Sequence, residues 1–172
     1  MKKLLLSITF ICAAVVGAFA QKTDAYQFSV GLEGGLPFGS ARNISTFVIG
    51  GSLKYAYPVC AATSLTVSAG YTYFPYRGDI TSNYIGYAKI NSGEGFVPLK
   101  AGVKYFLNSL FYAEGQLGAV IPMQSGESTK FAYAPGVGFQ FDNRADLGLR
   151  YEGWSSSKST INQVAVRLAY SF

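Results

Sequence analysis

Apolar residues recur at every second position through most of the chain after Lys22. Eight segments of about ten residues show this period of two, and stretches rich in turn-forming residues separate them. The predicted strands are 26–36, 47–57, 64–74, 96–107, 110–121, 131–142, 145–154 and 161–172. Because helical periodicity is absent from these segments, the pattern predicts an all-β fold.

The connections between the predicted strands alternate in length. Short ones fall at 58–63, 108–109 and 143–144, and longer ones at 37–46, 75–95, 122–130 and 155–160. Such asymmetry is typical of an outer-membrane barrel, which has tight periplasmic turns and longer external loops. A ten-residue strand rises about 33 Å, and a tilt of about 40° leaves roughly 25 Å along the membrane normal. The sequence therefore predicts an eight-stranded antiparallel up-and-down transmembrane β-barrel.

The two faces of each predicted strand differ in chemistry. In 161–172 one face carries Val164, Val166, Leu168, Tyr170 and Phe172, while the other carries Gln163, Ala165, Arg167, Ala169 and Ser171. Nearly all charges inside the strands lie on such a polar face, although alternation alone does not say which face is inside. Two further features favour apolar residues outside: the polar face is rich in small residues, which suit a narrow lumen, and tyrosines stand on the apolar face near strand ends. These tyrosines are Tyr26, Tyr55, Tyr57, Tyr73, Tyr105, Tyr151 and Tyr170.

A barrel of eight strands is only wide enough for side chains to fill its interior. Buried charges are tolerated when they are paired and hydrogen-bonded. We therefore predict a lumenal polar network in place of an open channel. Its members are Glu33, Lys54, Lys100, Lys104, Glu114, Gln116, Gln140, Asp146, Arg150, Glu152 and Arg167.

The first twenty residues have the form of an export signal. Two lysines precede an apolar run, and Ala18, Phe19 and Ala20 fit a small-x-small cleavage pattern. We expect residues 1–20 to be a cleaved secretory signal peptide and 21–172 to form the barrel domain. The mature chain would have 12 basic and 9 acidic residues, which is too mild a charge to indicate nucleic acid as a partner. It would also keep one cysteine, Cys60, so an intrachain disulfide is not expected.

The chain resembles the small eight-stranded outer-membrane β-barrels of the OmpX type and the OmpA membrane domain. The stretch "FVPLKAGVKYFLNSLFYAEGQLGAVIP" looks like the middle hairpin of that family. The resemblance implies that the last strand pairs with the first, and that the barrel assembly machinery reads the aromatic end of the last strand. Val166, Leu168, Tyr170 and Phe172 match that assembly signal. The implied partners are outer-membrane lipid, the assembly machinery and periplasmic chaperones, and the implied location is the bacterial outer membrane.

Catalysis is not expected, because the chain contains no histidine. Barrel enzymes of this size class, by resemblance, use histidine as a base, and serine, cysteine or threonine nucleophiles usually need one as well. A carboxylate pair could act alone, but Glu114 and Glu152 are better explained as partners of lumenal cations. One mature cysteine and no spaced carboxylate cluster give no indication of a metal or cofactor.

The long connection at 75–95 is the surface where recognition is expected, since loops on a rigid scaffold usually carry binding functions. It contains Arg77, Gly78 and Asp79, a tripeptide that some host adhesion receptors recognise. Weak alternation within it suggests that the third and fourth strands extend beyond the membrane, where an exposed edge could pair with a partner strand.

The sequence therefore predicts an outer-membrane barrel with a structural or surface-interaction role. Two alternatives stay open at this point. One is a small pore or transport protein. The other is a soluble periplasmic barrel, similar to a lipocalin, that binds an apolar ligand inside.

Overall fold

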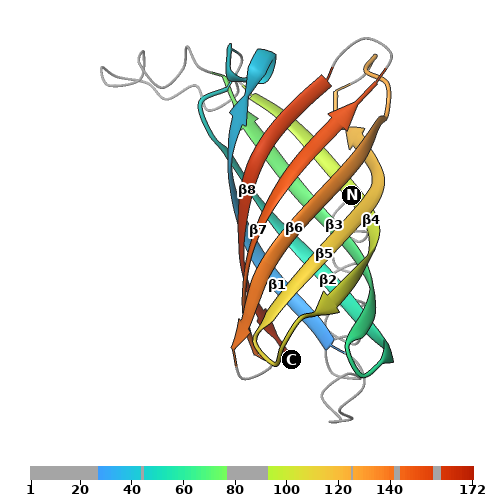
Figure 1. Ribbon diagram of the computed structural model, residues 1–172. Helices are drawn as coiled ribbons and strands as arrows, with labels where there is room; N and C mark the ends of the chain where they lie inside the picture. Colours follow the sequence, from blue (N-terminus) through green and yellow to red (C-terminus); the bar gives the residue numbers. More distant parts are fainter. Residues whose placement is uncertain (1–26, 44, 77–92, 125, 142–143, 157–159) are drawn as a thin grey trace, which may run out of the picture.

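The computed structural model describes residues 27–43, 45–76, 93–124, 126–141, 144–156 and 160–172, and in this part of the chain eight antiparallel strands form one closed barrel (Figure 1). The strands are β1 (Gln27–Phe38), β2 (Val48–Cys60), β3 (Thr63–Pro75), β4 (Gly93–Phe106), β5 (Phe111–Pro122), β6 (Lys130–Phe141), β7 (Ala145–Ser155) and β8 (Thr160–Ser171). Each strand pairs with its neighbours in sequence, and β1 also pairs with β8. The predicted eight-stranded up-and-down barrel is confirmed.

The strand ends differ most from prediction at two places. The sequence predicts a break at 58–63, but β2 continues through Pro58 to Cys60 and β3 already begins at Thr63. The register shifts between Pro58 and Cys60, and such a bulge accommodates a proline because the proline has no N–H for the ladder. The strand β4 begins at Gly93, earlier than the predicted start at residue 96.

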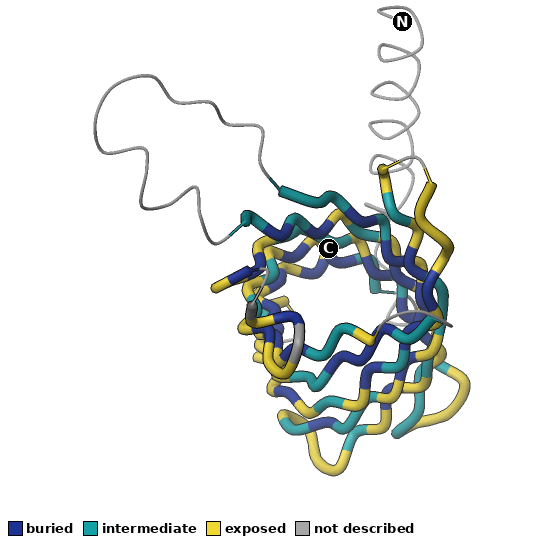
Figure 2. Tube along the Cα trace, turned by 90° about the horizontal axis from the view of Figure 1, so that it is seen from above, coloured by how far each residue is buried: buried dark blue, intermediate teal, exposed yellow. Residues whose placement is uncertain are grey.

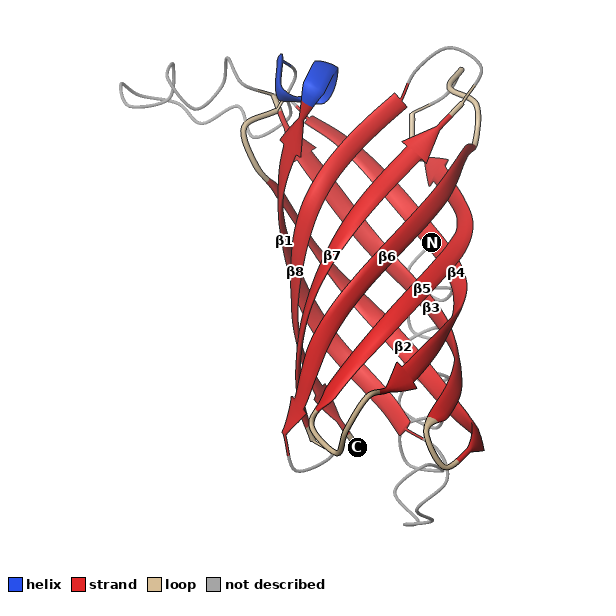
Figure 3. Cartoon of the chain, in the orientation of Figure 1, coloured by secondary structure: helices blue, strands red, loops and turns tan. Residues whose placement is uncertain are grey.

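Short turns lie at one end of the barrel and longer connections at the other (Figure 3). A 3₁₀ helix, η1 (Gly39–Asn43), occupies the connection between β1 and β2 and was not predicted. The chain can turn from β1 into η1 because Gly39 has a φ of 65°, a value that a residue with a side chain rarely adopts. Among the described residues no helix is long and apolar enough to cross a membrane.

Buried and exposed residues alternate along the strands (Figure 2). This alternation follows because successive side chains point to opposite faces of the barrel wall. Leu32 and Leu168 point outward with 73% and 61% of their surface exposed, whereas Arg167, next to Leu168 in sequence, is 3% exposed. In β8 the two faces match those predicted from the sequence. Relative to a soluble barrel the arrangement is therefore reversed, with charged side chains in the lumen and apolar side chains on the outer surface.

An apolar layer fills the lumen near the end that carries the long connections, which we call the external end. Phe74, Phe96 and Trp154 are almost fully buried there, and their ring centroids lie 5.2 to 5.4 Å apart. Val48, Val120 and Ala132 complete the cluster. Sequence alternation placed Phe74, Phe96 and Trp154 on strand ends but gave no sign that they would meet across the lumen.

Candidate functional site

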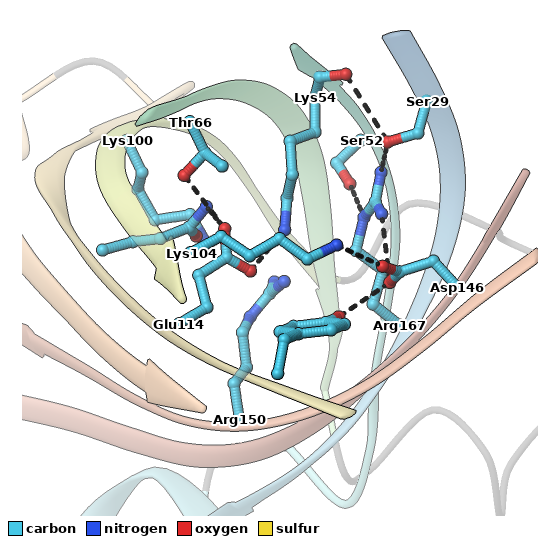
Figure 4. Close-up of polar contacts among 12 residues, drawn as sticks. Ser29, Ser52, Lys54, Thr66, Lys100, Lys104, Glu114, Asp146, Arg150 and Arg167 are labelled. Atoms are coloured by element: carbon cyan, nitrogen blue, oxygen red, sulfur yellow. Dashed lines mark hydrogen bonds and ion pairs between the residues drawn. The ribbon is translucent and has the colours of Figure 1, made fainter. Parts of the chain in front are cut away.

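The candidate site is the charged interior of the barrel, below the apolar layer. The structure places all of the side chains of the predicted lumenal network on inward-facing positions of the strands. They line the lumen together with smaller polar residues, as Figure 4 shows for part of the network, and most are buried. Their contacts cross the lumen, so residues far apart in sequence become partners.

Glu114 on β5 is the centre of one cluster. Its carboxylate accepts hydrogen bonds from Lys54 Nζ at 2.6 Å, from Thr66 Oγ1 at 2.9 Å and from Gln116 Nε2 at 3.0 Å. Lys54 and Thr66 come from β2 and β3, whereas Gln116 lies on β5 with Glu114 itself. A single carboxylate therefore ties three strands together.

Arg150 on β7 joins two carboxylates into a second cluster. Its two terminal nitrogens donate to the two oxygens of Glu33, and its Nε donates to Glu152 Oε2 at 3.1 Å. Lys100 Nζ donates to the other oxygen of Glu152 at 2.6 Å, and Gln163 Nε2 approaches Oε2 at 3.3 Å. The fork-to-fork contact with Glu33 is the strong bidentate kind that fixes orientation as well as charge.

Arg167 extends this cluster toward the other end of the barrel. Its guanidinium lies 3.7 Å from Glu33 and 3.8 Å from Asp146. Asp146 also accepts from Lys104 Nζ at 3.0 Å and from Tyr112 Oη at 2.9 Å. The charges thus form one continuous row in which cations and anions alternate: Lys100, Glu152, Arg150, Glu33, Arg167, Asp146 and Lys104.

Amide and hydroxyl groups satisfy the remaining bonds of the row. Lys104 Nζ donates to Gln140 Oε1 at 2.7 Å, and Gln140 in turn donates to Gln27 at 3.0 Å. Arg167 donates to Ser52 Oγ at 2.9 Å and to Ser29 Oγ at 3.1 Å.

Sequence reasoning gave no role to several of these partners: Gln27, Ser29, Ser52, Thr66, Tyr112 and Gln163. Their signal in the sequence is the polar face of the strand, on which each of them stands. Small polar residues on that face were interpreted only as space fillers.

The charged interior leaves little free space. A cavity beside Lys54, Tyr112, Glu114, Arg150 and Arg167 leaves about 20 Å³ for the centres of water molecules, which is room for about one. The cation of Lys104 also lies 3.8 Å from the centre of the Tyr112 ring, so an aromatic face covers it on one side. The arrangement is suited to neutralising charge and holding the wall together.

Two contacts at the external end fix the rim outside the strand interior. Tyr76 Oη donates to Glu94 at 2.7 Å, which joins the ends of β3 and β4. The carboxylate of Glu94, as acceptor of this bond, raises the pKa of the Tyr76 phenol above its usual value. Lys130 Nζ and Glu127 form a second pair at 2.8 Å. The base of the connection at 75–95 is therefore anchored on both strands.

Several predicted features lie outside the described residues. These are the signal peptide at 1–20, Tyr26, and the tripeptide Arg77, Gly78 and Asp79.

The predicted assembly residues on β8 are visible, and Val166, Leu168, Tyr170 and Phe172 all point outward. Phe172 N donates to Phe28 O at 2.9 Å, and its ring lies 5.2 Å from that of Tyr170. No group of three or more histidine, cysteine or carboxylate side chains suited to a metal ion occurs within the described ranges.

The chain is similar to several solved structures. No family model and no curated protein matches the chain. The crystal structure of Ail, the attachment invasion locus protein of Yersinia pestis, is similar over 87% of this chain and 100% of that one, with 16% identity and a TM-score of 0.61. The outer membrane enzyme PagL aligns over 82% and 97%, with 17% identity and a TM-score of 0.59. The N-terminal barrel domain of Pseudomonas aeruginosa OprF aligns over 85% and 97%, with 12% identity and a TM-score of 0.55.

These similarities establish the fold, because the identities are low while nearly the whole length of each neighbour is covered. The proteins differ in role, since one is an attachment protein and another an enzyme. The chain therefore has the fold of the small outer-membrane β-barrels, the fold that its resemblance to the OmpX and OmpA type implies.

Proposed function

We propose that this protein is an integral β-barrel of the bacterial outer membrane, with a lumen closed by side chains and a structural or surface-interaction role. One observation carries the proposal: the outer wall is an apolar surface around a charged interior. Outward residues such as Leu117, Leu149 and Val166 are about half exposed, while the inward Lys100, Glu152 and Arg167 are almost fully buried. Only a hydrocarbon environment makes that arrangement favourable.

The two alternative functions fit the geometry less well. A lipocalin-like barrel would need an apolar cavity in its interior and polar side chains on its outer surface, which is the reverse of this arrangement. A transport pore would need an open lumen, whereas the row of ion pairs and the aromatic layer fill this one. Both observations support a wall and scaffold in place of a carrier.

We infer that the protein lacks catalytic activity. The outer membrane enzyme PagL shares the fold, so the fold itself does not decide the matter. Two features of this chain support the inference: it has no histidine, and the lumenal carboxylates Glu33, Glu114, Asp146 and Glu152 are each held by at least one cation. A carboxylate held in this way is poorly available as a general base.

The surface-interaction role is assigned to the external connections. The similar protein Ail is an attachment invasion locus protein, and its structure is also known in complex with the heparin analogue sucrose octasulfate. In this chain the corresponding candidate is the connection at 75–95 with Arg77, Gly78 and Asp79, whose base the contact of Tyr76 with Glu94 anchors. An extracellular partner of this connection stays a proposal.

Assembly into the membrane is proposed to use periplasmic chaperones and the barrel assembly machinery. The outward row Val166, Leu168, Tyr170 and Phe172 supports this, because it offers an exposed apolar and aromatic edge next to the strand that closes the barrel. A Phe172→Ala variant should reach the outer membrane in smaller amount with unchanged synthesis.

Fractionation combined with gel migration tests the membrane assignment. We expect the protein to stay in the outer-membrane fraction after washing with alkali or high salt. In detergent, unboiled protein should migrate differently from boiled protein, because a closed barrel resists unfolding by detergent alone. Release by either wash would favour the soluble alternative and contradict the proposal.

A further inference from the structure

An apolar groove of about 600 Å³ lies on the outer face of the barrel, across β1, β2 and β8. Its walls are outward side chains of these strands: Leu32, Leu36, Phe47, Ile49, Val164 and Val166. Its floor lies at Gly34 on β1, because nothing comes within 4 Å of the place where a Cβ on Gly34 would stand. The groove exists because one outward position in a row of large apolar residues carries no side chain.

The groove lies in the half of the barrel near the external end. The strand β1 reaches that end at Phe38, and β2 starts from it at Val48. If the barrel spans the outer membrane as proposed above, this half lies in the outer leaflet. Water finds few hydrogen-bond partners in such an apolar groove. A flexible hydrocarbon chain can fill it and make dispersion contacts with its walls.

A basic residue stands on the short helix that follows the groove's end of β1. The helix η1 carries Arg42 in its last turn, and it contacts both β1 and β8 (Figure 1). Buried Ala41 and buried Ser45 fix this connection, since Ser45 N donates to Ala41 O at 3.1 Å and Ser45 Oγ donates to Phe47 O at 2.7 Å. Arg42 is exposed, and it lies on the helix that follows the external end of β1.

We propose that the groove binds an acyl chain of a phosphate-bearing lipid of the outer leaflet, with the lipid phosphate at Arg42. In such a lipid the acyl chain lies deeper in the membrane than the phosphate, and on the protein the groove likewise lies deeper than the helix that carries Arg42. A guanidinium group pairs with phosphate in a bidentate manner. The proposal rests on the proposed membrane location. It goes beyond that location by assigning one lipid site among all the surface that faces the bilayer.

Native mass spectrometry of the folded protein in detergent, with added lipid A as the probe, tests this site. We expect one bound lipid A on the wild-type protein at low molar excess. Gly34→Phe, which fills the groove, should lower the bound fraction at least fivefold. Arg42→Gln should lower it by a smaller factor and should remove its sensitivity to salt.

Gly115→Phe is the matched control. Gly115 also faces outward from a strand and also has nothing within 4 Å of its Cβ position, but it lies on β5, away from the groove. This variant should bind lipid A as the wild type does. Comparing boiled and unboiled migration for each variant shows separately whether the barrel has folded.

Three results would overturn the proposal while leaving the membrane assignment intact. The first is equal binding by all folded variants, which means lipid bound everywhere around the wall. The second is unchanged binding by Arg42→Gln, which removes the phosphate contact. The third is a species with two protein chains that Gly34→Phe abolishes, which would assign the groove to a second copy of the chain.

Discussion

Neighbouring residues on one strand experience opposite surroundings in this barrel. On β7, Leu149 points outward and is 49% exposed, while Arg150 points inward and contacts Glu33 and Glu152. The pleat alone separates these two environments, since successive side chains leave a strand on opposite faces. The change in the free energy of unfolding that a substitution causes should therefore depend on whether the position faces the lumen or the bilayer.

Replacing Leu149 by arginine should destabilise the folded barrel by about 2 to 4 kcal/mol, because the charge would face hydrocarbon near the middle of the bilayer. Leu107→Arg is the control. Leu107 is also exposed, but it lies in the turn after β4, where an arginine should cost about 0 to 1 kcal/mol. Urea unfolding in lipid vesicles, followed by the fluorescence of the single tryptophan, measures both values. Equal costs at the two positions would contradict the outward assignment of Leu149.

The pair of Lys54 and Glu114 allows a sharper test of the interior. Lys54→Met leaves a buried carboxylate without its cation, and Glu114→Gln leaves a buried cation without its anion. Each single change should cost about 3 to 5 kcal/mol. The double variant should recover most of the loss, because it removes both charges and keeps an acceptor for Thr66.

The same unfolding measurement, made as a double-mutant cycle, gives the coupling energy of the pair. Additive costs in the double variant would mean that the two side chains do not interact in the membrane-embedded protein.

The sequence could predict which side chains face the lumen, but it could not predict which of them pair with one another. Alternation places Lys104 and Asp146 inside, yet nothing in it says that Lys104 on β4 reaches across to β7 for its anion. That choice depends on the tilt of the strands and on which side chains share a level of the lumen. The same reason explains why Tyr112, which also contacts Asp146, received no role.

At the scale of the strand, glycine positions decide how closely the wall packs. Gly118 on β5 faces the lumen, and a Cβ there would collide with the backbone oxygen of Leu99 on β4. Gly115, on the same strand, faces outward into open space. The two glycines have opposite tolerances for one added methyl group.

Gly118→Ala should cost about 1 to 3 kcal/mol through overpacking, because backbone has to shift to make room. Gly115→Ala should be neutral or stabilising by about 0.4 to 1 kcal/mol, since it restricts the unfolded chain without a clash. Urea midpoints of the two variants in the same vesicles give the comparison. A larger loss at Gly115 than at Gly118 would reverse the inside and outside faces of β5.

Period-two patterning predicted the existence and order of the strands, and it failed where backbone details set their ends. The sequence predicts that the second strand ends before Pro58, but the bulge before Cys60 carries β2 past this proline. The helix η1 was hidden because five residues are too few for a helical period to appear. Both failures lie at connections, where hydrogen bonds outside the regular ladder determine the path.

At the scale of the whole molecule, closure is redundant. The aromatic layer of Phe74, Phe96 and Trp154 closes the external end, and the row of ion pairs fills the lumen beyond it. An ion would have to separate several buried charge pairs as well as displace aromatic rings. Each barrier alone should oppose the passage of an ion. The ion would lose its hydration water, and the side chains that it meets are already paired with one another.

Planar-bilayer recordings should therefore show no lasting conductance steps for the wild-type protein at either polarity. Phe96→Ala opens the aromatic layer, yet it should also be silent because the ion pairs below it keep the lumen filled. Leu99→Ala, an outward truncation on the same strand β4, controls for damage to the wall. Lasting steps in the wild type would favour the pore, whereas steps in Phe96→Ala alone would mean that the aromatic layer is the real barrier and that the charged row yields to ions.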